Sequence, residues 1–174
     1  MVSVQATLYT DTMKTAVADS ASWDTVIPLA PGAQLPFDLT NWKVLNGKAG
    51  LWDTLSKQSA SIVLRVEPFR TWATDISVTP LKVIAQPPTF NSREALFKGK
   101  VKNNTGRNII LGTVTVILRD KTNGKIVATG QTPLSIANAL APGETLNYSI
   151  ALPVESGFDP QFVQFEINSS GQQT

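Results

Sequence analysis

The sequence predicts an all-β protein built as a sandwich or a barrel. Helical periodicity is scarce along the 174 residues, and short runs of strand-forming composition follow one another instead. Eleven prolines and eleven glycines separate these runs. Short strands that recur at roughly 8–12-residue spacing, with turn signals between them, are typical of β-sandwiches and barrels.

Ten segments have the composition and alternation of strands. In chain order they are residues 2–9, 25–29, 34–39, 61–67, 81–86, 95–102, 109–119, 125–131, 145–152 and 161–167. Two other segments favour a helix. In residues 50–59, Leu51, Trp52 and Leu55 have helical spacing, and residues 135–139 predict a single turn.

Three turns join strands of the second half. Asn123-Gly124 supplies the positive φ angles of a tight hairpin. Pro142-Gly143 fixes φ at the first position and frees it at the second, which predicts a type II turn. Residues 103–106, Asn-Asn-Thr-Gly, predict the third turn.

Residues 95–102 alternate between two faces, and one face carries Lys98, Lys100 and Lys102. Such a face could bind an acidic partner or nucleic acid. No aromatic residue is interleaved with the lysines, so we expect a solvated face that also protects an edge strand from aggregation. The three lysines remain candidate interaction residues.

The composition excludes several kinds of site. The chain has no His and no Cys, which removes Ser-His-Asp triads, Cys nucleophiles, disulfides and the usual zinc or haem ligands. A net charge of +2 does not mark a nucleic-acid-binding protein. No apolar run approaches the ~18 residues of a membrane span, and the chain passes from Met1 directly into a predicted strand without an export leader. We expect no enzymatic activity, no metal and no cofactor.

The tryptophans and aspartates of the first half are candidates for binding or catalysis. Exposed tryptophans stack on sugar rings or anchor interfaces, although burial in a core is the commoner role. Paired carboxylates form glycosidase sites, but the spacing of the aspartates here is not diagnostic and several occupy turn positions. The candidate interaction residues are therefore the four tryptophans, Trp23, Trp42, Trp52 and Trp72.

The chain contains an internal repeat. The pattern Leu-Ala-Pro-Gly-x-x-Leu-x-aromatic-x-aliphatic begins at Leu29 and again at Leu140. Each copy follows a similar strand, which contains Leu8-Tyr9 in the first half and Leu118-Arg119 in the second. A collinear repeat of this length predicts two related β domains.

The second half resembles a known family. The motifs are Phe97-x-Gly99-x-Val101-x-Asn103, Thr105-Gly106, Val114-x-Val116-x-Leu118-x-Asp120, Gly124-Lys-Ile-Val127 and Pro142-Gly143-Glu144. Together they are similar to the bacterial FxLYD-type immunoglobulin-like domains, over about residues 81–168. The name motif is degenerate, since Val116 stands for Phe and Arg119 for Tyr, while the first half keeps Leu8-Tyr9 but inserts Thr10 before Asp11. The resemblance implies seven-stranded sandwiches, a place outside the cytoplasmic membrane and no catalytic residues.

The two halves are unequal. Two predicted strands, 81–86 and 95–102, precede the strand that ends at Asp120, whereas nothing precedes strand 2–9. A first domain without counterparts of these strands exposes core and strand edges. The natural chain extends further, or the first domain closes itself with residues 41–59, or a strand of another subunit completes it. The sequence leaves all three open.

The resulting prediction is two tandem immunoglobulin-like β-sandwich domains, at 1–78 and 79–168, joined near residues 72–79 and followed by a frayed polar tail at 169–174. We expect a non-catalytic, extracytoplasmic, bacterial module that binds protein partners or spaces them from a surface. It binds no nucleic acid, and any membrane anchor lies outside this chain. The alternatives are a structural filament subunit that self-associates through strand edges and a carbohydrate-binding module.

Overall fold

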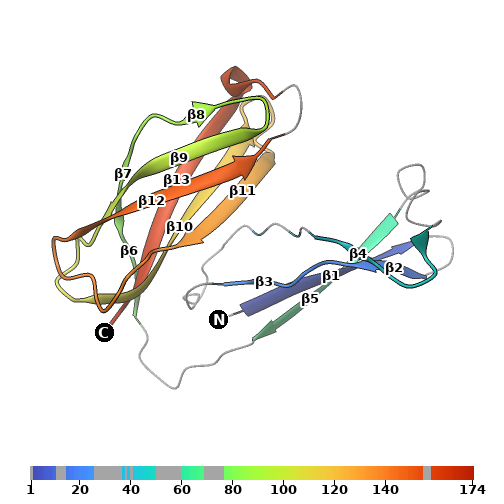
Figure 1. The fold of residues 1–174 in the computed structure, drawn as a ribbon, viewed down its shortest axis with the longest axis horizontal. Helices are drawn as coiled ribbons and strands as arrows, with labels where there is room; N and C mark the ends of the chain where they lie inside the picture. Colours follow the sequence, from blue (N-terminus) through green and yellow to red (C-terminus); the bar gives the residue numbers. More distant parts are fainter. Residues whose placement is uncertain are drawn as a thin grey trace. The chain divides into compact units, whose positions relative to one another are not determined.

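The computed structural model describes residues 2–10, 15–25, 37, 39, 41–49, 60–68, 77–154 and 158–174. The named elements in these ranges are β-strands and the short 3-10 helix η2 (Pro160–Phe162) (Figure 1), and Ala49 alone is in α-helical conformation among the described residues. The chain is all-β, as the sequence predicts. It divides into two compact units, the first containing β1–β5 and the second β6–β13.

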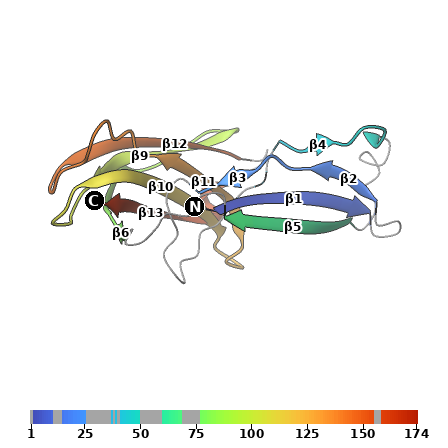
Figure 2. The same ribbon diagram turned by 90° about the horizontal axis from the view of Figure 1, so that it is seen from below.

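The first unit is a sheet built around one central strand. Its strands are β1 (Val2–Thr10), β2 (Ala16–Asp19), β3 (Trp23–Asp24), β4 (Lys43–Val44) and β5 (Ala60–Pro68). β1 pairs on one side with β5 and on the other with β2 and β3, while β4 pairs with β2. All pairs are antiparallel, and Figure 2 shows β5 as the outermost strand beside β1.

The second unit has two facing sheets. Its strands are β6 (Val78–Pro80), β7 (Lys82–Ala85), β8 (Thr89–Phe90), β9 (Glu94–Lys102), β10 (Ile109–Asp120), β11 (Ile126–Pro133), β12 (Thr145–Pro153) and β13 (Val163–Gln173). One sheet has the order β11-β10-β13-β6 and the other β12-β9-β7, with β8 also paired to β9. Figure 1 shows the two sheets lying face to face, which is a sandwich-like arrangement.

Alternate residues of the long strands form the core of the second unit. Phe97 of β9 and Leu152 of β12 come from one sheet, while Val116 and Leu118 of β10 come from the other, and all four are buried. The ring centroid of Phe97 lies 5.5 Å from that of Phe165 on β13, in an edge-to-face contact. The core therefore forms between the sheets, as strand alternation requires.

Turns lie near residues 123–124 and at 142–143 as the sequence predicts, but Gly124 alone of the Asn123-Gly124 pair has a positive φ, and residues 105–107 form bends. Gly124 and Gly143 have φ angles of 71° and 84°, a region that favours glycine. At the hairpin between β10 and β11, the Asp120 carboxylate accepts hydrogen bonds from the backbone N–H and the hydroxyl of Thr122. This Asx-type turn explains why aspartate ends β10.

The two halves of the internal repeat share a local geometry. The pairing of β1 with β2 shifts register between Leu8 and Tyr9, and the pairing of β10 with β11 shifts between Leu118 and Arg119. These are the residue pairs that the sequence repeat matches. In both units the next partner, β5 or β13, lies on the other side of the same strand.

Two expectations about the second unit are wrong. Residues 135–139 form bends rather than a helical turn. The tail at 169–174 is not frayed, because β13 extends to Gln173 and pairs with both β10 and β6. Ser169 is buried and its hydroxyl donates a 2.9 Å hydrogen bond to the carbonyl oxygen of Thr113, so polar residues continue the sheet.

Several sequence predictions concern residues outside the described ranges. These are most of the segments 25–29 and 34–39, all of segment 50–59, and most of the first copy of the repeat. Thr25, Phe37 and Leu39 are described and are not in strands. The first unit's last strand ends at Pro68, and the second unit's first strand begins at Val78.

Candidate functional site

β1 and β5 are the longest described strands of the first unit, with nine residues each. They pair with each other over their full length. The register runs from Val2 opposite Pro68 to Thr10 opposite Ala60. Among the described residues β5 has no partner on its other side. An edge of this length presents a row of free backbone N–H and C=O groups that another strand can pair with.

One face of β5 carries an apolar stripe, which we define as Ile62, Leu64 and Val66. Their side chains are 57%, 49% and 60% exposed. The residues directly opposite them on β1 are Leu8, Ala6 and Val4, of which Ala6 and Val4 are buried. The stripe therefore extends a buried face of the sheet onto a strand that stays open to solvent.

The other face of β5 is mixed and carries an ion pair. The Arg65 Nε donates a 2.8 Å hydrogen bond to Glu67 Oε1, and another guanidinium nitrogen lies 2.7 Å from the same oxygen. Both side chains are exposed, so the pair adds little stability, but it leaves the strand without net charge. Val63, on the same face, is 54% exposed.

In the second unit an equivalent face is partly covered, although Phe165 stays 45% exposed. β13 stands beside β10 as β5 stands beside β1, with Phe165 opposite Leu118 and Ile167 opposite Val116. Phe97, from the facing sheet, packs on Phe165. In the described part of the first unit, no second sheet covers the stripe.

The lysines of β9 are placed differently from the expectation. Lys98 and Lys100 are exposed and Lys102 is half-buried, but β9 pairs with β12 on one side and with β7 and β8 on the other. The proposal that these lysines protect an edge strand is therefore wrong, because β9 is central. Their face also receives Lys82 of β7, directly opposite Lys102.

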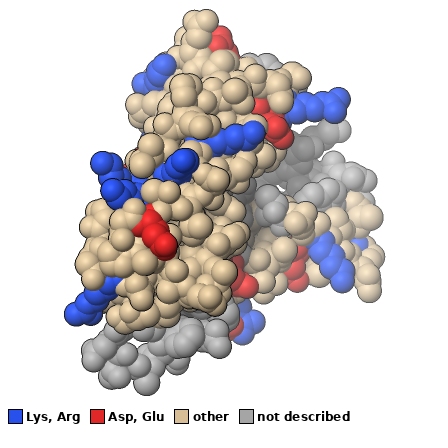
Figure 3. Space-filling view, turned by 60° about the vertical axis from the view of Figure 1, so that its left-hand side comes forward, with Lys and Arg blue, Asp and Glu red and all other residues tan. Residues whose placement is uncertain are grey.

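The four lysines form a basic face on the β7–β9–β12 sheet. Figure 3 shows Lys and Arg side chains spread over one view of the molecule, with Asp and Glu side chains between some of them. Within the described ranges, none of the four is in an ion pair. Gln86, Asn147 and Ser149 join Lys98 and Lys100 around an open hollow of about 460 Å³. The basic face suits an acidic segment better than a small apolar ligand.

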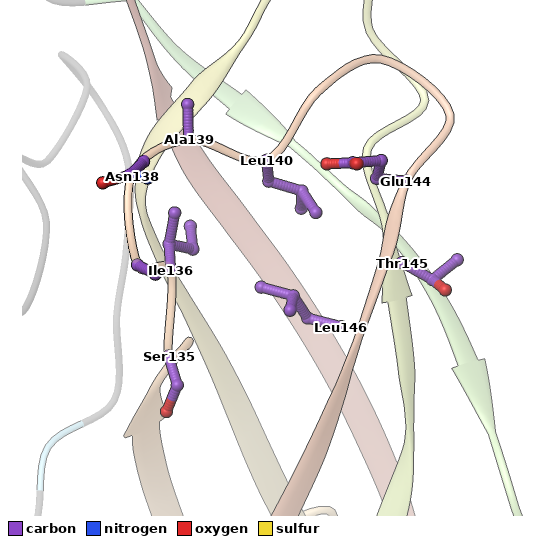
Figure 4. Close-up of a pocket in the computed structure, with 9 residues that line it drawn as sticks. Ser135, Ile136, Asn138, Ala139, Leu140, Glu144, Thr145 and Leu146 are labelled. Carbon is purple, nitrogen blue, oxygen red and sulfur yellow. The ribbon is translucent and has the colours of Figure 1, made fainter.

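A second hollow of about 360 Å³ lies where residues 135–140 approach residues 144–146. Figure 4 shows the side chains of Ile136, Leu140 and Leu146 pointing into it. Glu144 is the one titratable group among its described lining residues, and its carboxylate accepts a 2.8 Å hydrogen bond from the N–H of Ala141. That carboxylate is occupied in closing the loop, so the hollow shows no catalytic arrangement.

Two of the four tryptophans, Trp23 and Trp42, lie among the described residues. Trp23 lies in β3, opposite Val4, and Trp42 is half-buried just before β4. Trp52 and Trp72 lie outside the described residues. The carbohydrate-binding surface therefore stays a prediction.

Sequence reasoning identified β5 as a strand but missed its exposure. Alternation of Ile62, Leu64 and Val66 with Ser61, Arg65 and Glu67 predicts one apolar face. Alternation alone does not say whether that face is covered or which edge is paired. One sequence signal does point to this exposure. The first half has no counterparts of the predicted strands 81–86 and 95–102, and a sandwich that lacks those strands leaves one face of its sheet open.

No protein-family model matches the chain, and no characterised protein matches it in sequence. In the described ranges, no cluster of three or more acidic side chains could hold a metal ion. No helix in those ranges is long and apolar enough to cross a membrane.

Proposed function

We propose that the chain is a non-catalytic protein-binding module that accepts an extended segment of its partner alongside β5. The observation that carries this proposal is a nine-residue strand with an exposed apolar stripe and with one edge that no described residue pairs with. A strand added at this edge gains backbone hydrogen bonds, and alternate side chains of that strand extend the stripe. The lack of His and Cys supports a role without catalysis.

The stripe supplies enough apolar surface to matter. Full burial of an aliphatic side chain contributes about 1.5–3 kcal/mol, so the three half-exposed side chains leave roughly 2.5–5 kcal/mol available to a partner. The backbone edge sets direction and register, while the stripe selects partners with apolar residues at alternate positions.

The resemblance of the second half to FxLYD-type domains supports a place outside the cytoplasmic membrane. In that setting the module belongs to a surface-associated assembly, where the second unit spaces or orients the first. The carbohydrate-binding alternative has no described contact in its favour.

A synthetic peptide tests the proposal. Residues 2–10 already match β5 residue by residue, with Val4, Ala6 and Leu8 facing the stripe. A fluorescent peptide of this sequence should bind the full chain saturably, as measured by anisotropy. The control peptide has Lys in place of those three residues and should not bind.

Two variants of the chain complete the test. Leu64→Lys places a charge in the stripe and should weaken peptide binding by at least about ten-fold. Val63→Lys changes the neighbouring residue of similar exposure on the opposite face and should have little effect. Absence of saturable binding, or equal losses in both variants, would contradict the proposal.

A further inference from the structure

We infer that the partner at β5 is a second copy of this chain, paired antiparallel through its own β5 about a two-fold axis at Leu64. This inference rests on the proposed function, since it needs the same open edge. It goes further because it names the partner and fixes the register.

The apolar stripe is self-complementary in this register. Leu64 lies opposite the partner's Leu64, and Ile62 lies opposite the partner's Val66. Every stripe residue then faces another stripe residue on the same side of the sheet. Two copies related by a two-fold axis present the same surface to each other, which is the commonest form of a symmetric dimer.

Other registers fit less well. Any register that lacks a residue on the axis sets stripe residues opposite Val63 or Arg65, so the stripes fall on opposite faces. A two-fold axis at Arg65 would place two arginines directly opposite each other, which is unfavourable. An axis at Val63 would leave residues at the end of each strand unpaired, so fewer backbone hydrogen bonds would form between the two copies. The register centred on Leu64 uses all nine residues of the strand.

Charge does not oppose this pairing. Arg65 is already paired with Glu67 in its own strand, so each β5 brings no net charge to the interface. In the register centred on Leu64, Arg65 lies opposite the partner's Val63, and Glu67 lies opposite the partner's Ser61. Like charges therefore do not stand directly opposite each other.

Cysteine cross-linking tests the register directly, because the chain has no Cys of its own. The full chain with Leu64→Cys should form a covalent dimer under mild oxidation, since residues directly opposite in an antiparallel pair lie within disulfide reach. Val63→Cys is the matched control. Its equivalent in the partner lies diagonally, about 7–8 Å away between Cα atoms, and should cross-link at least about ten-fold more slowly.

A second pair of variants keeps the test independent of any one substitution. Ile62→Cys and Val66→Cys should each cross-link poorly alone but should form a mixed dimer when combined. Circular dichroism checks that each variant keeps its strand content.

The outcomes separate this inference from the proposed function. Equal rates at Leu64 and Val63, or a chain that stays monomeric and uncross-linked while it binds the strand peptide, would overturn the second-copy partner and leave the binding edge intact. Failure of both cross-linking and peptide binding would overturn both.

Discussion

Asn103 is a single buried side chain that holds two loops of the second unit together. Its Nδ2 donates 2.8 Å hydrogen bonds to the carbonyl oxygens of Arg107 and Leu140, which lie in different loops. Its Oδ1 accepts from both the N–H and the hydroxyl of Thr105. The side-chain amide is thus used at both ends, which explains an Asn-x-Thr sequence at this turn.

Asn103→Ala should destabilise the chain by about 2–4 kcal/mol, because it leaves buried carbonyl groups without donors. Urea unfolding followed by circular dichroism measures this loss. Asn104→Ala is the control, since Asn104 is exposed and makes one bond, to the N–H of Lys82. A loss below about 1 kcal/mol at Asn103 would show that water replaces its bonds.

Tyr148 places a hydroxyl group in the core without a hydrogen-bond partner in the described part of the chain. Burial raises the pKa of that hydroxyl. The ring lies over Gly99, the residue directly opposite on β9, where a larger side chain would meet the hydroxyl and the carbonyl oxygen of Ile84.

Tyr148→Phe keeps the ring and removes the unpaired hydroxyl, so stability should stay the same or rise by up to about 1 kcal/mol. Thermal and urea unfolding both measure the change. A loss of more than about 1 kcal/mol would reveal a partner for the hydroxyl.

Asp120 makes the stability of the β10–β11 hairpin depend on pH. The Thr122 hydroxyl, followed by the Thr122 N–H, lowers the pKa of the Asp120 carboxyl. Because the folded pKa is the lower one, the stabilisation is present above the unfolded pKa and is lost as the pH falls through the folded value. The difference in urea midpoint between the natural chain and Asp120→Asn should therefore shrink between about pH 6 and pH 2. A constant difference would contradict this linkage.

At the scale of the element, β9 combines a buried face with a lysine face on a central strand. Lys82 and Lys102 stand directly opposite each other, which costs stability on a sheet surface.

Lys82→Gln should therefore stabilise the chain by about 0.2–1 kcal/mol at low salt, and the gain should shrink at high salt. Urea unfolding at two salt concentrations measures it. Lys98→Gln is the matched control, because Lys98 lies opposite Ser149. Equal gains from both variants would point to overall charge rather than to the opposed pair.

The long strands could be predicted from sequence, and of the short ones β7 (Lys82–Ala85) alone was predicted, as residues 81–86. Alternation located β1, β5, β9, β10 and β12 to within one or two residues. β2, β3, β4, β6 and β8 are two to four residues long, too short for alternation to register, and they form because longer strands offer them an edge. The polar end of β13 was misjudged because its burial comes from β10 and β6, which sequence composition does not show.

The sequence also did not show which strands pair with each other or which strand faces are covered. Lys98, Lys100 and Lys102 suggested an edge strand, yet β9 is central. Alternation predicts that Ile62, Leu64 and Val66 share one face, but it does not show that this face is exposed. The pairing and covering of a strand depend on residues that are distant in sequence.

At the scale of the whole molecule, the two units share a hairpin geometry but differ in how their sheets are completed. In the second unit, the sheet of β7, β9 and β12 packs against the sheet that contains β10 and β13. The first unit presents β5 as an open edge in the described residues. A two-fold pairing of β5 uses that edge up in both copies, so it yields a closed dimer, whereas a filament would need a second, different edge on each copy.

Residue-resolved amide hydrogen exchange tests the open edge of β5 most directly. In an antiparallel pair, alternate N–H groups of β5 point toward β1 and the others point away. In a dilute sample, the first set should exchange slowly and the second set quickly, and the second set should become protected when the chain is concentrated or the strand peptide is added. If both sets are equally protected in the dilute sample, the edge is already filled within the chain, and β5 is not the binding strand.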